Sequence, residues 1–310
     1  MGNESFFKRY WFTMLLFAVI VVAAGLMLRF GPSPAAGVPQ MSVILLIVLI
    51  IVGFAAGLLG GWIGTGGCSV MLPVLHFWLG FPAAIAVGTT LFAVIFTAIS
   101  GGYGHFRKRN VDGRVGWWLG GMGVAGVILG SWLFTFLSSK SAVLGLIIGI
   151  VFLWPSIRMI WEGIVAYRKD ANASAAQGSA KEQSIAGRPA TLSIFGFVVG
   201  VLTGLVGLGG GYALVPGLIY LFGASVYLTM GTSLAVMVPL AIVGGGIKLA
   251  QGFVFLGAAL VLAAGTIVGA QIGAATIKKF RPNTLKLIFG IYFLYVAAKF
   301  IGNFFGVNIW

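Results

Sequence analysis

Residues 60–75 read GGWIGTGGCSVMLPVL, and residues 203–218, 143 positions later, read TGLVGLGGGYALVPGL. Each stretch places a cluster of glycines inside a long apolar run. Irregular backbone is tolerated at membrane depth only where protein buries it or where it lines a cavity. The duplicated stretch therefore predicts two specialised loops inside a membrane protein.

The composition predicts a polytopic membrane protein. The 310 residues are 60% hydrophobic and 8% charged, unlike a soluble domain. The net charge of +14 does not indicate nucleic-acid binding, because the Lys and Arg residues stand at the ends of apolar runs. The single cysteine, Cys68, excludes an intrachain disulfide and disfavours a cysteine-built metal site. The lipid bilayer is the expected surrounding, and no metal or cofactor is predicted.

The two halves of the chain align without a gap at an offset of 143 residues. Prolines and a threonine match as well as glycines, so coincidence in a glycine-rich chain is a poor explanation. The aligned pairs include Gly53 and Gly196, Gly57 and Gly200, Gly61 and Gly204, Gly64 and Gly207, Gly66 and Gly209, Gly67 and Gly210, Pro73 and Pro216, Gly80 and Gly223, Gly88 and Gly231, and Thr89 and Thr232. We expect an N-terminal helix and connection over 1–40, a first repeat over 41–167, a solvated linker over 168–190 and a second repeat over 191–310.

Most apolar runs are long enough to cross a bilayer as helices, which takes about 20 residues. Two shorter runs, 68–80 and 210–222, each follow a glycine cluster. Each is either half of a broken helix that crosses or the returning arm of a re-entrant hairpin, which we favour. The expected fold class is an all-α polytopic membrane protein of two inverted-topology repeats, with one extra N-terminal transmembrane helix over 10–29.

Four groups of cations predict the orientation, because Lys and Arg collect on the cytoplasmic side. They are Lys8 and Arg9; Arg107, Lys108, Arg109 and Arg114; Arg168, Lys169, Lys181 and Arg188; and Lys278, Lys279, Arg281 and Lys286. The N-terminus and the linker are then cytoplasmic, the C-terminus is extracytoplasmic, and the second repeat is inverted relative to the first. The expected location is a bacterial inner membrane, and a homo-oligomer is left open.

The two glycine clusters are the predicted anion site. Glycine lets the backbone approach a ligand closely, and the unpaired N–H groups at the start of a half-helix attract anions. The predicted substrate-binding residues of the loops are Gly64, Thr65, Gly66, Gly67, Cys68 and Ser69, with Gly207, Gly209, Gly210 and Gly211 in the second copy. In contrast, the four-residue spacing of Gly53, Gly57 and Gly61 favours close helix packing.

A second polar element is also repeated. Gly88-Thr89-Thr90 and Gly231-Thr232-Ser233 each lie at the start of a long apolar run. The four hydroxyl groups are predicted to donate hydrogen bonds to an oxyanion. The alternative is that these side chains bond back to a carbonyl one turn earlier in their own helix.

Five single residues carry open alternatives. Lys248 could attract an anion at the outer mouth, but we expect it to extend to the membrane interface. His105 aligns with Lys248 and is expected to be solvated, whereas His76 is expected to be a packed, hydrogen-bonded imidazole. Cys68 is expected to fill space, with contact to a sulfur substrate as the alternative. Gln271 is either a helix–helix hydrogen bond or a site residue.

The small number of acidic residues and the lack of enzyme motifs limit the possible mechanisms. The acidic residues are Glu4, Asp112, Glu162, Asp170 and Glu182, and none is convincingly placed at mid-membrane. A carboxylate proton relay or sodium site is therefore disfavoured. The chain also has no HExxH, GxSxG or GxxxxGKS/T motif, so hydrolysis and ATP-driven pumping are disfavoured and an enzyme is not expected.

These features resemble the sulfite exporter TauE/SafE family of bacterial membrane transporters. The resemblance rests on GGWIGTGGCSVMLPVL with the later GTT, on TGLVGLGGGYALVPGL with the later GTS, and on the loop HFRKRNVDGRV, over about residues 43–303. It implies transport of small anions, often sulfur oxyanions or sulfonates such as sulfite and sulfoacetate, commonly as export. The chain departs from the family in its extra N-terminal helix and in carrying the HFRKRN-type loop in the first half only.

The sequence thus predicts a secondary transporter of a small inorganic or organic anion. A sulfur oxyanion or organosulfonate is expected as substrate, export is favoured, and alternating access would operate around the two loops near the bilayer midplane. Two other classes stay open. The same loops would suit a passive anion channel, and an intramembrane enzyme or a non-transporting subunit would have His76 and Cys68 as its reactive candidates.

Overall fold

The computed structural model describes residues 6–31, 37–172, 185–277 and 282–307. All regular structure in these residues is helical, in agreement with the predicted class. The helices are α1 (Phe6–Phe30), α2 (Val43–Ile63), α3 (Cys68–Pro73), α4 (Ala83–Arg107), α5 (Gly113–Leu137), α6 (Ser141–Asn172), α7 (Pro189–Val206), α8 (Gly211–Tyr220), α9 (Val226–Ala250), α10 (Leu256–Thr276) and α11 (Pro282–Phe304), with a π-helical turn over Val74–Trp78. Much of the predicted linker, including Lys181 and Glu182, lies outside the described residues, as do Glu4, Lys278, Lys279 and Arg281.

Local chemistry sets the ends of these helices. The Ser42 hydroxyl accepts from the Leu45 amide at the start of α2, and the Asp112 carboxylate accepts from two amides at the start of α5. Pro189 occupies the first turn of α7, where a missing N–H costs nothing. α2 and α7 both end at a glycine with left-handed torsions, Gly64 and Gly207.

The second half repeats the helix bounds of the first at the same 143-residue offset. α4 begins at Ala83 and ends at Arg107, and α9 begins at Val226 and ends at Ala250. Positive φ angles recur at the offset too, in Gly64, Gly66, Gly67, Gly80 and Arg109 and again in Gly207, Gly209, Gly210, Gly223 and Gly252. The sequence repeat is therefore also a repeat of backbone conformation.

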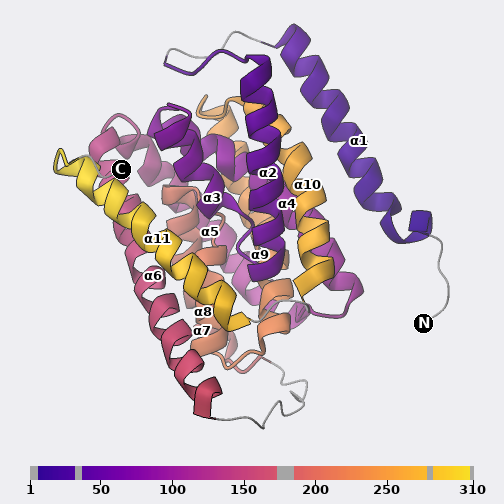
Figure 1. Ribbon diagram of the computed structural model, residues 1–310, viewed down its shortest axis with the longest axis vertical. Helices are drawn as coiled ribbons and strands as arrows, with labels where there is room; N and C mark the ends of the chain where they lie inside the picture. The colour runs from indigo at the N-terminus through magenta and orange to yellow at the C-terminus, as the bar shows by residue number, and fades with distance from the viewer. Residues whose placement is uncertain (1–5, 32–36, 173–184, 278–281, 308–310) are drawn as a thin grey trace.

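Both short segments return to the end of the molecule from which they came. A methyl group placed on Gly37, before α2, would lie 3.5 Å from Pro82, which follows the π-helical turn. In the second half, the Ala186 amide before α7 donates to the Phe222 carbonyl after α8 at 3.1 Å. α2 with α3, and α7 with α8, are thus re-entrant hairpins, the alternative that the sequence favoured (Figure 1).

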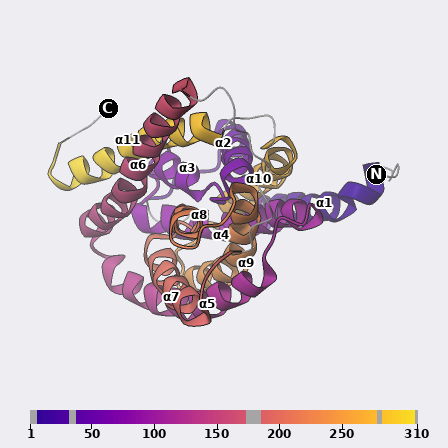
Figure 2. The ribbon, with the colours of Figure 1, turned by 90° about the horizontal axis from the view of Figure 1, so that it is seen from below.

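Glycines bring helices from different halves into close contact. Methyl groups on Gly53 and Gly57 would lie 2.3 and 2.4 Å from carbonyl oxygens of α10, and Gly61 also abuts α10. Gly196 and Gly200 abut α5 in the same way. The packing role predicted for Gly53, Gly57 and Gly61 is confirmed, and the two interfaces tie each hairpin to the other half of the chain (Figure 2).

α4 and α9 cross the middle of the molecule in opposite directions. Gly101 of α4 packs against Leu234 near the start of α9, and Gly244 near the end of α9 packs against Leu91 near the start of α4. Equivalent helices of the two halves therefore run antiparallel through the bundle. Their inverted placement in a membrane stays a prediction.

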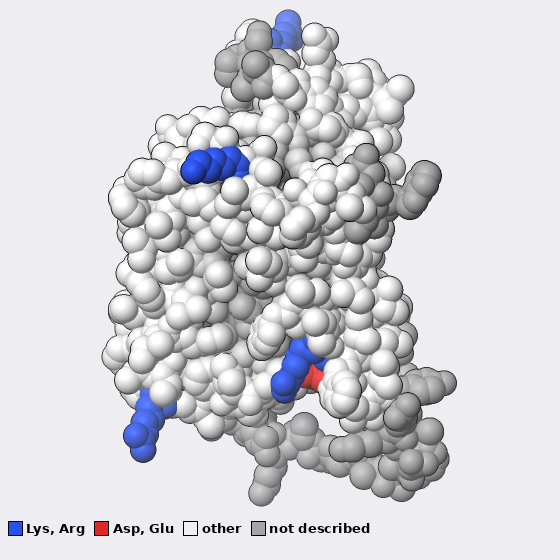
Figure 3. All heavy atoms as spheres, turned by 90° about the vertical axis from the view of Figure 1, so that its left-hand side faces the viewer, with Lys and Arg blue, Asp and Glu red and all other residues white. Residues whose placement is uncertain are grey.

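The surface is that of a multi-pass membrane protein. Eight described helices are long and apolar enough to span a bilayer. Large apolar side chains lie on the outside, with Ile44 75% and Trp117 76% exposed. On the face in Figure 3 the charged residues lie toward the upper and lower ends, and the middle is uncharged. α1 stands at the edge of the bundle, against α10 (Figures 1 and 2).

Candidate functional site

The two glycine loops meet at the centre of the molecule. A methyl group on Gly66 would lie 2.3 Å from the terminal carbon of Met237 and 3.3 Å from Val94. One on Gly209 would lie 2.7 Å from the same Met237 carbon and 3.0 Å from the same Val94 carbon. Val94 of α4 and Met237 of α9 are themselves repeat equivalents. Two side chains thus cover both loops, and they fill the space in front of them.

Direct contacts also join the loops. The Cys68 thiol donates to the Leu208 carbonyl of the second loop and lies 3.6 Å from the Thr65 carbonyl of its own. A methyl group on Gly211 would lie 2.5 Å from the Thr65 Cα. Cys68 is 1% exposed, so it fills space as expected, and its thiol also links the two loops.

The loop glycines are needed for their backbone torsions. Gly64, Gly66 and Gly67 have φ angles of 80°, 72° and 76°, which side chains disfavour. The Gly67 carbonyl accepts from the Val70 and Met71 amides. The amides that precede Val70 therefore take no part in the helix's own hydrogen bonds. The Gly210 carbonyl plays the same part before α8. Amides in such positions form anion sites when a ligand reaches them.

The Gly-Thr pairs hold the turn of the opposite half. The Thr89 hydroxyl oxygen accepts from the Phe255 amide at 3.0 Å, just before α10. The Thr232 oxygen accepts from the Asp112 amide at 2.9 Å, just before α5. Gly88 and Gly231 allow this approach, because methyl groups there would lie about 2 Å from carbonyl oxygens of the same turns. These two threonines therefore fasten each long helix to the other half.

The hydroxyl groups one position later are also engaged. Thr90 donates to the Ala86 and Val87 carbonyls at 2.8 and 3.1 Å, which is the back-bonded alternative. Ser233 instead reaches across to the Gly64 carbonyl at 2.8 Å and so connects α9 to the first glycine loop. Both hydroxyl protons are used within the protein in this conformation.

A cavity of about 50 Å³ lies beside the first loop. Thr65 lines it, together with Tyr212 from the first turn of α8 and apolar residues of α8 and α9. The Tyr212 hydroxyl is buried and has no hydrogen-bond partner. Tyr212 is not among the site residues predicted from the sequence, although it is the repeat equivalent of the predicted Ser69, which is also buried.

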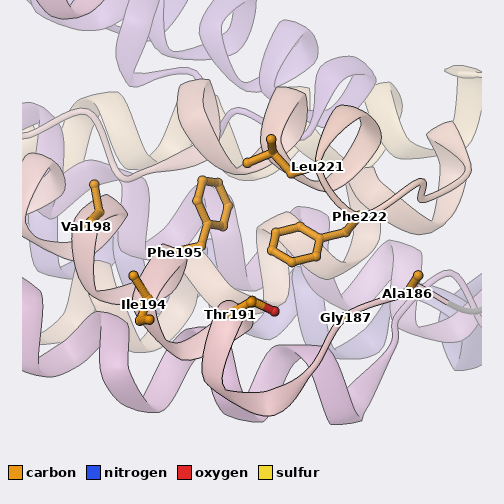
Figure 4. A pocket seen from close by; sticks show the side chains of 8 residues that line it. All are labelled: Ala186, Gly187, Thr191, Ile194, Phe195, Val198, Leu221 and Phe222. Carbon is orange, nitrogen blue, oxygen red and sulfur yellow. The ribbon is translucent and has the colours of Figure 1, made fainter.

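A larger hollow, of about 580 Å³, lies at the mouth of the second hairpin (Figure 4). Phe195 and Phe222 lie next to each other in its lining, with ring centroids 5.6 Å apart. Thr191 supplies the one side-chain hydroxyl of the lining. Apart from Thr191 the lining of this hollow is apolar, and it includes no residue of either glycine loop.

Two basic residues differ from expectation. Lys248 does not extend to the interface, and His105 is not solvated, because both are 0% exposed. The Phe134 ring covers the Lys248 ammonium, and the Asn110 amide folds back onto the His105 carbonyl at 3.1 Å. The alternatives left open for His76 and Gln271 are resolved. His76 Nδ1 forms a hydrogen bond with the Phe81 carbonyl at 2.9 Å, and Gln271 donates to the Ser100 carbonyl of α4 at 2.8 Å.

In the part of the chain that the structure describes, no three or more His, Cys, Asp and Glu side chains gather as a metal site. What the site does contain is two re-entrant glycine loops, two helix N-termini and a few hydroxyl groups. The chain is thus a multi-pass helical membrane protein whose two halves meet at paired hairpin loops.

The chain belongs to the sulfite exporter TauE/SafE family, whose model matches residues 48–300. It is a membrane transporter of that family, as its relatives' names also indicate. It is 29% identical to the probable membrane transporter protein YdhB of Bacillus subtilis, over 74% of this chain and 89% of that protein. It is 27% identical to YunE of the same species, over 82% and 97%, and 27% identical to a probable membrane transporter protein of Xylella fastidiosa, over 81% and 91%. No solved structure matches the chain.

Proposed function

We propose that this chain is a secondary transporter of a small anion, with a sulfur oxyanion or organosulfonate as substrate and export as the favoured direction. One observation carries the proposal: a glycine loop from each half meets the other beneath the same two side chains, Val94 and Met237. Two converging loops from opposite ends are what a centrally placed, alternately exposed site requires. The family description supports a sulfite-like substrate.

Backbone amides and hydroxyl groups would supply the donors. The N-terminus of a helix such as α8 attracts an anion by about 0.3–1 kcal/mol when exposed and by up to about 2 when partly buried. This modest attraction suits a transporter, because the substrate must also leave. Thr65 and Tyr212 line the cavity beside the first loop, and their hydroxyl groups would add donors there. That cavity holds on the order of three to five water-sized groups, which is about the size of sulfite.

The conformation described here would be occluded. Met237 and Val94 cover both middle glycines, so the loops become accessible only when α4 and α9 shift or when the flexible Met237 side chain swings away. In the open conformations Thr89, Thr90, Thr232 and Ser233 would add their hydroxyl groups to the site.

In a bacterial inner membrane the N-terminus and the 168–190 segment would be cytoplasmic and the C-terminus extracytoplasmic. The described basic residues support this orientation. Arg107 and Arg109 follow α4, Arg114 begins α5, and the Arg114 side chain donates to the Ile185 carbonyl close to Arg188. These residues therefore share one end of the bundle, as the cytoplasmic preference of arginine predicts.

Purified protein in proteoliposomes tests the proposal. Sulfite, sulfate, thiosulfate and small sulfonates would be offered separately, and we expect saturable movement of sulfite or a sulfonate. Under an imposed pH gradient or counter-anion gradient, the substrate should accumulate above its equilibrium level. Accumulation that never exceeds equilibrium would identify a passive channel instead. Failure to move any of the anions would refute transport of this class.

A further inference from the structure

His105 and Lys248 occupy equivalent positions in the last turns of α4 and α9, at opposite ends of the molecule. Both side chains are completely buried. His105 Nε2 lies 3.3 Å from the Gly61 carbonyl, and its Nδ1 has no partner. Lys248 has no hydrogen-bond partner at all for its three ammonium donors. A basic side chain that is buried in a membrane protein with unused hydrogen-bonding groups indicates a functional position.

Neither of the two acidic residues whose side chains are described, Asp112 and Glu162, forms an ion pair with Lys248. Asp112 is held by Thr232, which lies 16 residues from Lys248 along α9, or about 24 Å. Glu162 binds Arg158 at 3.0 Å. The Lys248 ammonium instead rests 3.1 Å from the centroid of the Phe134 ring, a contact that holds a cation while leaving its hydrogen-bond donors unused.

A stripe of small residues leads from Lys248 to the meeting point of the glycine loops. Gly244 and Ala241 lie on the same face of α9 as Lys248, and the next residue on that face is Met237, which covers both loops. The flexible Leu91 side chain of α4 and the shorter Val127 side chain of α5 fill the space beside Gly244. From Lys248 to Met237 the stripe is 11 residues long, about 16 Å. The matching stripe on α4 consists of His105, Gly101, Ala98 and Val94, with Leu234 beside Gly101.

We infer that Lys248 is an anion-binding residue on the route between the glycine loops and the end of the molecule remote from Arg107, with His105 as its counterpart on the other route. The inference rests on the proposed function and concerns the same small oxyanion. When the Lys248 end opens, the ammonium exchanges the Phe134 ring for the anion, which passes along the Gly244 face. The unpaired donors and the buried, uncharged surroundings together favour this occupant over a protein carboxylate.

Transport kinetics measured from each face test the inference. Sulfite and a small sulfonate would be supplied to right-side-out and inside-out vesicles containing the wild type, Lys248→Met or Lys248→Arg. Lys140→Met is the matched control, because it removes an exposed lysine beyond the end of α5, close to Phe134 in sequence. Loss of a charge-assisted hydrogen bond predicts that Lys248→Met raises KM about tenfold on the Lys248 face. Lys248→Arg and Lys140→Met should stay near the wild type, and KM on the opposite face should change little.

His105→Gln should show the reverse sidedness, raising KM on the face where His105 lies. A KM for Lys248→Met that matches Lys140→Met on both faces would overturn the inference while leaving transport itself intact. An equal loss on both faces, accompanied by a lower unfolding temperature, would also overturn it by showing a structural role. A wild type that moves none of the anions would overturn the inference together with the proposed function.

Discussion

Alanine substitutions at the middle glycine of each loop, Gly66 and Gly209, should distinguish the effect of backbone strain on stability from the role of the loops in transport. Gly66 and Gly209 have φ angles of 72° and 69°, and Gly80 and Gly223, in the same two hairpins, have 74° and 64°. Alanine in this region costs about 1–2 kcal/mol wherever it is placed. The surroundings differ, because methyl groups at Gly66 and Gly209 would lie 2.3 and 2.7 Å from Met237, whereas nothing lies within 4 Å at the other two positions.

All four variants should lose about 1–2 kcal/mol to backbone strain, and the central two should lose somewhat more because Met237 must move. Only the central two should lose transport. The added methyl group would displace Met237 and occupy the meeting point of the loops, so we expect sulfite flux to fall at least about tenfold, the equivalent of about 1.4 kcal/mol. Flux in proteoliposomes and thermal unfolding followed by tryptophan fluorescence would be measured for each variant. Equal flux in Gly66→Ala and Gly80→Ala, at equal unfolding temperature, would remove the loops from the mechanism.

Further predictions concern the contacts between the halves. Thr89→Val and Thr232→Val should each lower stability by about 1–3 kcal/mol, measured by thermal unfolding, because each leaves a backbone N–H without its acceptor; unchanged unfolding would exclude the fastening role. Met237→Gly should raise passive sulfite leak in proteoliposomes by uncovering both loops. A leak equal to that of the wild type would show that another group closes the site. Gly200→Ala, whose methyl group would lie 2.0 Å from a carbonyl of α5, should destabilise the protein, whereas Gly121→Ala, with nothing within 4 Å, should be tolerated.

Local residue chemistry made much of the fold predictable. The offset of 143 residues located the hairpins and the loops, because a left-handed glycine ends a helix whatever surrounds it. The packing role of Gly53 and Gly57 followed from their spacing alone. The choice of a hairpin over a crossing segment was favoured by the sequence but needed the contact between the chain before α7 and the chain after α8.

The partners of polar side chains could not be predicted, because they belong to distant parts of the chain. Thr89 meets an amide 166 residues away, and nothing near Thr89 in the sequence indicates this. Lys248 sits in the last helical turn, where lysine normally reaches water, and the contact of its ammonium with the Phe134 ring of α5 is not visible in the sequence. Tyr212 has Ser69 as its repeat equivalent. The alignment of the halves therefore indicates a small hydroxyl-bearing residue at this position and gives no sign that the larger side chain of Tyr212 lines the cavity.

Each half of this chain packs its hairpin against a long helix of the other half, through α2 with α10 and α7 with α5. Neither half completes a hydrophobic core on its own. We therefore expect the covalent connection between the halves to contribute little to the folded structure. The two halves expressed as separate polypeptides should therefore assemble in the same cell. A half-length polypeptide that inserted in both directions could build the same bundle as an antiparallel pair.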